Sequence, residues 1–169
     1  MAGATAVEGT AATDPPTRAV ARVLLIDEAE RVLLLSTRDA DGTMYWFAPG
    51  GGIDPDEDAA AAALREVWEE TGLRDVQLDG EVWHRRHRFT WRSAEHHQFE
   101  RWFLARVHAF NPVPQALTEV EQEEIAEYRW WSLSDLEATN DVLNPRALAQ
   151  LLGSLLATGV PPRPIEIGV

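Results

Sequence analysis

Residues 51–73, GGIDPDEDAAAAALREVWEETGL, gather acidic side chains at a spacing that can hold a cation. On a helix, which turns by about 100° per residue, Glu66, Glu69 and Glu70 fall within about 100° of one another. Carboxylates at such positions lie about 5–6 Å apart and repel each other. Mg²⁺ accepts carboxylate ligands and completes its shell with water and phosphate oxygens, so it would turn this repulsion into a site. The alternative is an acidic, solvated helix face.

The order of the fixed residues in this stretch favours the cation site. The fixed positions are Gly51, Glu57, Arg65, Glu66, Val67, Glu69, Glu70, Gly72 and Leu73. Together they resemble the complete Nudix box, the signature of hydrolases that act on nucleoside diphosphates linked to another moiety. The resemblance implies a metal-dependent enzyme, with Mg²⁺ or Mn²⁺ as cofactor, that cleaves a diphosphate linkage in a nucleotide-type small molecule.

The same resemblance assigns roles to residues of the box and to the residue before it. The implied metal ligands are the backbone carbonyl of Gly50 and the carboxylates of Glu66, Glu69 and Glu70. One of these glutamates would also serve as the general base. Arg65 would orient the glutamates through charge-assisted hydrogen bonds, and Glu57 would pair with Arg65 or cap the helix.

The family often adds one more carboxylate from a loop that precedes an aromatic strand. In this chain the segment LTEVEQEEIAEYRWW offers Glu119, Glu121, Glu123, Glu124 and Glu127. We expect Glu124, six residues ahead of Trp130, to be the additional metal-binding and catalytic carboxylate. Because its neighbours are equally acidic, a solvated acidic run is the alternative.

Substrate contacts are expected from the loop ahead of the box and from a long strand after it. Arg38 lies in that loop and can reach phosphate, although a surface arginine fits equally. On the strand, the period of two places these residues on one face: Trp83, Arg85, His87, Phe89 and Trp91. We expect Arg85 and Phe89 to grip phosphate and stack on a base. The alternative is an aromatic row facing the core.

Three rival functions depend on particular residues. A non-catalytic Nudix module that binds a nucleotide derivative as a sensor would be expected to lose Glu66, Glu69 or Glu70, and all three are present. A Nudix-like isomerase normally needs a reactive cysteine, which the chain lacks. Family members that act on ADP-ribose often carry proline where His87 stands, which disfavours that substrate.

Composition limits the partners and the chemistry. The 169 residues suit one domain and carry 28 acidic and 15 basic side chains, a formal net charge of −13. Such a chain binds polyanions poorly, so we expect neither a nucleic-acid partner nor an anionic membrane. The same reasoning disfavours an RNA-decapping role, which would need a basic RNA-binding surface or an appended domain. All the basic residues are arginine, which excludes a P-loop and Schiff-base chemistry. The absence of cysteine excludes disulfides and thiolate nucleophiles.

Targeting signals are not apparent. Residues 1–17 have neither the basic nor the apolar region of a secretory signal, and no run reaches 18 apolar residues. We therefore expect a cytoplasmic protein. Seven tryptophans leave room for a homodimer interface.

The elements that must position these residues follow from periodicity and turn signals. We expect strands over residues 19–26, 31–35, 45–47, 75–91, 97–107 and 128–133. Helices are expected from Asp54 to Gly72 and over residues 144–158. The expected domain covers residues 18–160, between a disordered tail at 1–17 and a C-terminal tail at 161–169. This order predicts an α/β fold with a mixed sheet, and the resemblance implies the Nudix α/β/α sandwich.

Overall fold

The computed structural model describes residues 16–91 and 93–168. Its strands are β1 (Thr17–Ile26), β2 (Val32–Arg38), β3 (Met44–Phe47), β4 (Gly50–Gly52), β5 (Gly80–Trp91), β6 (Ala94–Arg106), β7 (Ile125–Trp131), β8 (Val142–Asn144) and β9 (Ile165–Ile167). Its helices are α1 (Ala59–Thr71), α2 (Glu119–Glu124), α3 (Leu133–Ala138) and α4 (Leu148–Thr158). The tail expected at 1–17 lies outside the described residues up to residue 15.

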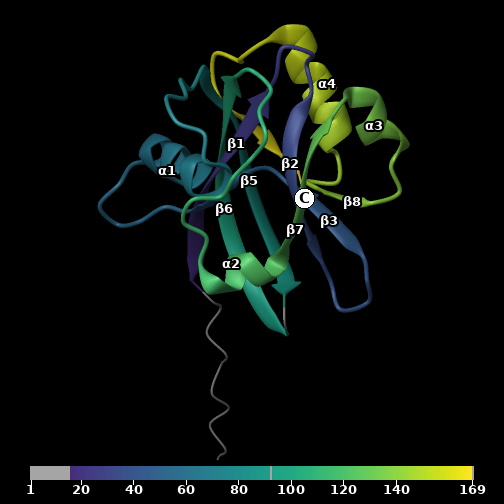
Figure 1. Ribbon diagram of the computed structural model, residues 1–169. Helices are drawn as coiled ribbons and strands as arrows, with labels where there is room; N and C mark the ends of the chain where they lie inside the picture. The colour runs from purple at the N-terminus through teal and green to yellow at the C-terminus, as the bar shows by residue number, and fades with distance from the viewer. Residues whose placement is uncertain (1–15, 92, 169) are drawn as a thin grey trace, which may run out of the picture.

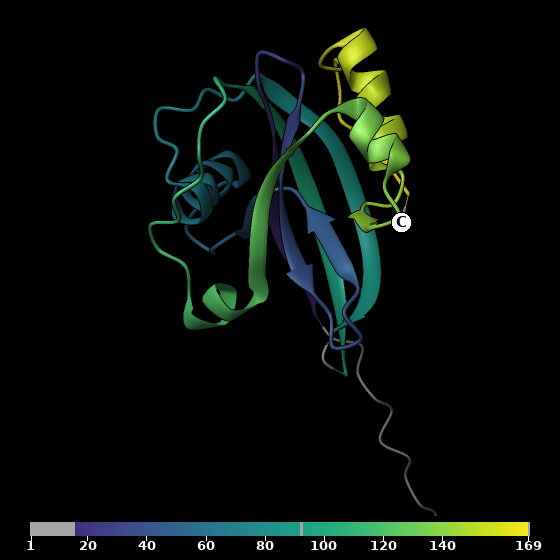
Figure 2. The same cartoon turned by 45° about the vertical axis from the view of Figure 1, so that its right-hand side comes forward.

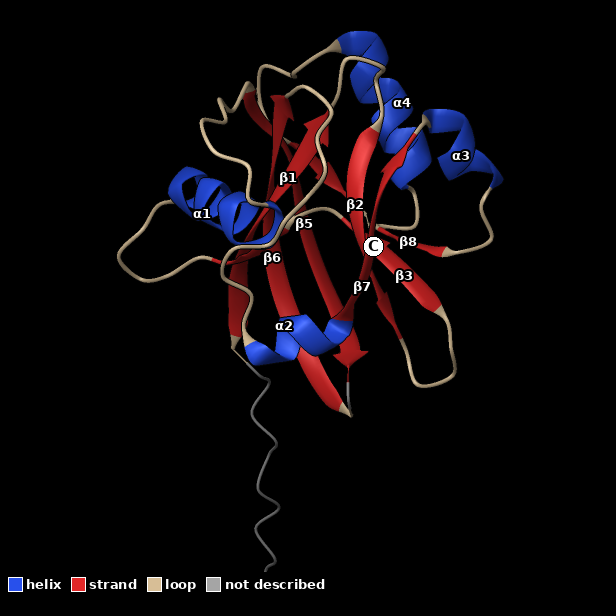
Figure 3. Cartoon of the chain, in the orientation of Figure 1, coloured by secondary structure: helices blue, strands red, loops and turns tan. Residues whose placement is uncertain are grey.

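The strands form one mixed, curled sheet in the order β8-β3-β2-β1-β6-β5-β9 (Figures 1 and 3). β1 lies at its centre, antiparallel to β2 and parallel to β6 along its whole length. β4 pairs with β1 and β7 pairs with β2, both outside this order. Sequence-distant segments therefore meet at the middle of the sheet.

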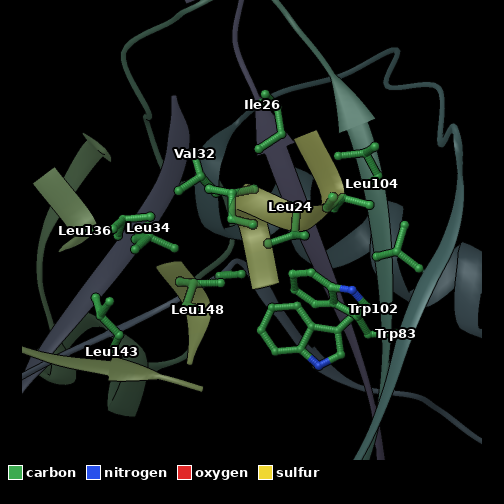
Figure 4. Packing of buried hydrophobic residues seen from close by; sticks show 14 of the residues in the cluster. Leu24, Ile26, Val32, Leu34, Trp83, Trp102, Leu104, Leu136, Leu143 and Leu148 are labelled. Carbon is green, nitrogen blue, oxygen red and sulfur yellow. The ribbon is translucent and has the colours of Figure 1, made fainter. Parts of the chain in front are cut away.

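Helices cover both faces of the sheet, with α1 on one side and α3 and α4 on the other (Figure 2). Successive side chains of β1 alternate between the two layers. Ala21, Val23 and Leu25 pack with the alanines of α1. Leu24 and Ile26 pack with the leucines of α3 and α4 and with Trp102 (Figure 4). This arrangement confirms the predicted α/β/α sandwich.

Helix α1 begins four residues later than the sequence suggested. Asp58, rather than Asp54, is the N-cap, and its side chain accepts a hydrogen bond from the backbone N–H of Ala61. Residues before it form a turn because the Glu57 carboxylate accepts from the Asp54 N–H. Its C-terminal end agrees with the prediction, since Gly72 caps the helix in the left-handed conformation.

Several elements were not expected, among them β4, α2, β8 and β9. Asn144, expected to start the second helix, ends β8, and α4 begins at Leu148. Helix α2 occupies the segment that we treated as a loop, and its start carries a capping box between Thr118 and Glu121. Strand β9 lies within the predicted C-terminal tail and pairs in parallel with β5, and Ile167 is buried in the core. The domain limits at 18 and 160 remain a prediction. None of the described helices is both long and apolar enough to cross a membrane.

Candidate active site

Three carboxylates from two helices converge beside the glycine strand β4. Glu66 and Glu70 lie one turn apart on α1, and Glu121 comes from the first turn of α2. One oxygen of each carboxylate lies within 4.8 Å of the others. Glu66 and Glu70 are buried, so their charges are not dispersed by water. Three acceptor-only groups at this separation form a donor set suited to a divalent cation.

The glycines of β4 make room for this cluster. Gly50 has a φ of +147°, and its N–H donates to Oε2 of Glu70 at 2.8 Å. A Cβ atom on Gly51 would collide with the carboxylate of Glu66. The glycine strand is therefore the wall against which both carboxylates rest, and a side chain at position 51 would displace one of them.

Burial makes these carboxylates hard to ionise while no cation is bound. Glu70 is 4% exposed, and its burial raises the pKa to about 8, although the hydrogen bond from Gly50 and the charge of Arg22 oppose this. Burial also raises the pKa of Glu66, against a smaller lowering by Arg65. A bound cation would supply the missing positive charge and favour the ionised forms.

Arg65 holds the outer side of the cluster. Its guanidinium donates to Oε1 of Glu57 at 2.6 Å, to Oε1 of Glu66 at 2.8 Å and to Oε2 of Glu69 at 3.1 Å. It also donates to the carbonyl of Gly52 at 2.9 Å. The hydrogen bonds to Glu57, and next those to Glu66, raise the pKa of Arg65. Arg65 thus ties α1 to the turn before it and fixes the orientation of Glu66.

A cavity of about 640 Å³ opens next to the carboxylates. It lies over the sheet face that also carries the core against α3 and α4, because Val20 and Arg22 alternate along β1 in step with Leu24 and Ile26. At one end it is lined by β4, Glu70 and the α2 residues Glu121 and Glu124. Phe47 lies under Arg22 next to β4. The rest of the wall carries aromatic and basic side chains, among them Tyr45, Arg85, His87, Phe89, Trp91 and Arg146.

The curl of the sheet closes the far end of the cavity. β5 and β8 lie far apart in the strand order, yet Nη1 of Arg85 donates to Oδ1 of Asn144 at 2.6 Å. Arg85 is 3% exposed and also lies 3.4 Å from Oε2 of Glu100. On strand β5, Trp83 packs in the core and Arg85 lines the cavity. The core-facing alternative therefore holds for Trp83, and the cavity-facing one holds for Arg85.

Glu100 is the centre of a buried ionic group in the floor of the cavity. Arg22 lies 3.6 Å from Oε1 of Glu100, and Trp102 donates to its Oε2 at 3.0 Å. Nε2 of His87 lies 3.4 Å from Oε1, without the alignment of a hydrogen bond. Burial alone would raise the pKa of Glu100, but His87, Arg22 and Arg85 outweigh it and lower that pKa to about 2.

Several residues predicted as ligands occupy different places. Glu121, rather than Glu124, joins Glu66 and Glu70 in the cluster, while Glu124 lines the cavity. Glu69 is paired with Arg65 and is not part of this group. The carbonyl of Gly50 accepts from Nη1 of Arg22 at 3.2 Å.

Of the residues predicted to contact substrate, two line the cavity and one does not. Arg85 and Phe89 line the cavity. Arg38 is exposed, donates to the carbonyl of Gly42 at 3.1 Å, and is not among the described residues of the cavity wall. Sequence reasoning missed Glu100 and Arg146. Glu121 was among the five candidate glutamates but was ranked below Glu124, although the Thr118–Glu121 spacing of a capping box was a readable signal for α2.

The comparisons with known proteins agree on one family. Residues 16–152 match the family model described as "NUDIX domain". The RNA pyrophosphohydrolase of Roseobacter denitrificans is 32% identical over 131 residues, which cover 72% of this chain and 80% of that protein. The RNA pyrophosphohydrolase of Acidiphilium cryptum is 34% identical over 144 residues, which cover 76% and 84%.

Solved structures show the same fold. A MutT protein from Methanosarcina mazei superposes with a TM-score of 0.60 at 23% identity, over 86% of this chain and 97% of that chain. An Ap4A hydrolase from C. elegans superposes with a TM-score of 0.59 at 22% identity, over 83% and 98%.

Proposed function

Because the chain belongs to the NUDIX domain family, we propose that the carboxylate cluster and the adjoining cavity form the active site of its pyrophosphohydrolase activity. The protein is a Nudix hydrolase that cleaves a diphosphate linkage in a nucleotide-type molecule. The observation that carries the site assignment is the approach of Glu66, Glu70 and Glu121 to one another at the mouth of the cavity. The rival interpretation, a non-catalytic sensor, receives no support from the comparisons.

Dependence on a divalent metal is general in this family, and the donor set fits Mg²⁺ or Mn²⁺. Carboxylate oxygens are the ligands that these ions prefer, and burial raises the pKa of Glu70, so a bound cation would favour its ionised form. We propose Glu66, Glu70 and Glu121 as ligands. When bound, the metal lowers the pKa of a water, screens the phosphates and aligns the leaving group.

Three further residues next to the cluster have proposed roles in the reaction. Glu69, held by Arg65, stands beside the cluster as a further ligand or as the general base that takes the proton from the attacking water. Glu124 lines the cavity and is proposed for the same proton-accepting role. The carbonyl of Gly50 retains a lone pair beyond the one used by Arg22, so it remains a proposed ligand.

The cavity walls suit the nucleotide part of a substrate. Phe89 and Tyr45 offer aromatic faces on which a base can stack, and Arg85 offers donors to phosphate or base acceptors. Arg38 stays a proposed phosphate contact only if its loop moves, because its guanidinium is engaged with Gly42.

A second candidate substrate is the pyrophosphate at the end of an RNA chain. It is favoured by the two RNA pyrophosphohydrolases that are 32% and 34% identical to this chain over the aligned residues. The net charge of −13 opposes extensive backbone contact, so such recognition would be confined to the terminal nucleotides.

A substrate screen tests these assignments. Nucleoside triphosphates, dinucleoside polyphosphates, nucleotide sugars, CoA esters and triphosphorylated RNA would be incubated with Mg²⁺ or Mn²⁺, with released phosphate or nucleotide as the readout. We expect Glu70→Gln to stay folded and to lose at least about 100-fold in turnover, since removing even an indirect metal contact costs 10–100-fold. Glu119→Gln, an exposed glutamate of α2, is the control. Full turnover by Glu70→Gln would overturn the assignment.

Two further proposals concern the protein in its setting. We propose that it acts in the cytoplasm, where nucleotide substrates are made and used. A homodimer remains a proposal, and size-exclusion chromatography with light scattering would test it.

A further inference from the structure

Basic side chains gather in the cavity of an otherwise strongly acidic protein. Five of the chain's fifteen basic residues line it: Arg18, Arg22, Arg85, Arg88 and Arg146. Arg18 and Arg22 belong to β1, which pairs with the glycine strand next to the carboxylates. The other three come from β5 and from the segment after β8, at the far end. Binding of the scissile diphosphate near β4 therefore accounts for only part of this charge.

Arg85 has unused hydrogen-bonding capacity in the cavity floor. Its hydrogen bonds to Asn144 and Glu100 both use Nη1. Nε is buried and has no hydrogen-bond partner among the described residues. A buried donor without a partner is unfavourable, and an acceptor bound in the cavity would relieve this once the guanidinium shifts slightly toward it. Asn144 and Glu100 fix the guanidinium, so its free edge has a set direction.

His87 presents a second buried nitrogen at the same place. The side chain is largely buried, and its Nε2 makes no hydrogen bond with any described residue. Its ring stacks on Phe89 with centroids 5.0 Å apart, which holds it on the same sheet face as Arg85. Arg85 and His87 are thus two buried residues beside the cavity that each have a nitrogen without a hydrogen-bond partner among the described residues.

Arg146 adds a positive charge without a protein counterion. It is exposed, lines the cavity, and makes no salt bridge or hydrogen bond within residues 16–91 and 93–168. Two residues later α4 begins, an eleven-residue helix whose N-cap Ala147 provides no side-chain hydrogen bond. The positive end of this helix therefore adds to the potential around Arg146.

The charges do not cancel within the floor. Arg22 and Arg85 share the single carboxylate of Glu100, which leaves one positive charge, and Arg146 contributes another. Arg22 and Arg85 reach this carboxylate from β1 and β5, so both of their charges lie in the floor, whereas Arg146 follows β8 and adds its charge from another part of the wall.

We propose that Arg85, His87 and Arg146 form a second anion subsite, which binds a phosphate of the substrate other than the diphosphate that is cleaved. This inference rests on the proposed active site near β4. Two sources share the chemistry: a 2′- or 3′-phosphate on the ribose of a small nucleotide, and the phosphate that joins the first two nucleosides of an RNA end.

Binding without turnover tests the subsite directly. Adenosine 3′,5′-bisphosphate and adenosine 5′-monophosphate differ by one phosphate, and calorimetry in the presence of a chelator would compare them. We expect the bisphosphate to bind at least about tenfold more tightly, since hydrogen bonds from a guanidinium to phosphate are charge-assisted and strong. Arg146→Gln should reduce this preference to about twofold or less.

A matched control and a second variant keep the result interpretable. Arg163→Gln removes an exposed arginine that is not among the cavity residues and should retain the full preference. Arg85→Gln should also lose the preference, with its melting temperature recorded because Arg85 is buried. Equal binding of the two ligands by the wild type, or a preference that survives both Arg146→Gln and Arg85→Gln, would overturn the subsite.

Kinetics distinguishes the source of the phosphate and separates this proposal from the activity itself. A lower KM for CoA than for dephospho-CoA, abolished by Arg146→Gln, identifies a small nucleotide. A lower KM for a triphosphorylated dinucleotide than for the nucleoside triphosphate, abolished likewise, identifies RNA. If the wild type hydrolyses none of the tested substrates but still prefers the bisphosphate, the proposed active site is contradicted and the subsite is supported.

Discussion

At residue 51, the lack of a side chain leaves the space that the Glu66 carboxylate occupies. We predict that Gly51→Ala weakens Mn²⁺ binding by about 10–100-fold, because a displaced ligand costs at least as much as a lost indirect contact. Electron paramagnetic resonance of free Mn²⁺ would measure it. The control is Gly153→Ala in α4, where a Cβ would lie an ordinary 3.4 Å from Leu133. It should bind Mn²⁺ normally, and equal binding by both variants would refute the prediction.

Glu100 provides a prediction about pH. Its folded-state pKa of about 2 lies below the ordinary value of 4.5, so its ionised form stabilises the fold at neutral pH. This contribution is present above pH 4.5 and is lost as pH falls toward 2. By linkage it is on the order of 3 kcal/mol. We expect Glu100→Gln to lower the melting temperature at pH 7 and to flatten its decline between pH 4.5 and 2. Parallel melting curves would contradict this.

Among elements, α2 delivers one carboxylate of the site, and its capping box fixes its first turn. Thr118→Ala removes that cap and should cost about 0.5–2 kcal/mol. We predict that it also weakens Mn²⁺ binding, because the Glu121 carboxylate keeps the backbone N–H of Thr118 as a donor but loses the hydroxyl. Ser132→Ala removes the equivalent cap of α3, which is remote from the carboxylates. It should cost similar stability with no change in Mn²⁺ affinity, as calorimetry would show.

The elements that sequence could and could not predict differ for physical reasons. The β1–β2 hairpin and the body of α1 follow from strong periodicity and a glycine C-cap. The choice of Glu121 over Glu124 did not follow, because five similar glutamates stand close together and only the docked orientation of α2 separates them. β9 was missed because a three-residue strand is specified by its pairing with β5, a tertiary contact.

For the whole molecule, a cation that binds only the folded state should raise its stability. We predict that Mg²⁺ at about 100 times its dissociation constant stabilises the wild type by about 2.7 kcal/mol. Differential scanning fluorimetry with and without chelator would record the shift in melting temperature. The double variant Glu66→Gln/Glu70→Gln should show little shift, since its two buried acidic ligands are neutral. A full shift in that variant would place the cation elsewhere.

The bond between Arg85 and Asn144 also bears on selectivity by size. This hydrogen bond joins β5 to the edge strand β8 across the cavity, so the curled sheet cannot open easily between these two strands. The cavity walls therefore keep a fixed spacing before a substrate binds, and the protein loses little conformational entropy on binding. Substrates that are wider than this spacing are excluded by steric clashes with the walls.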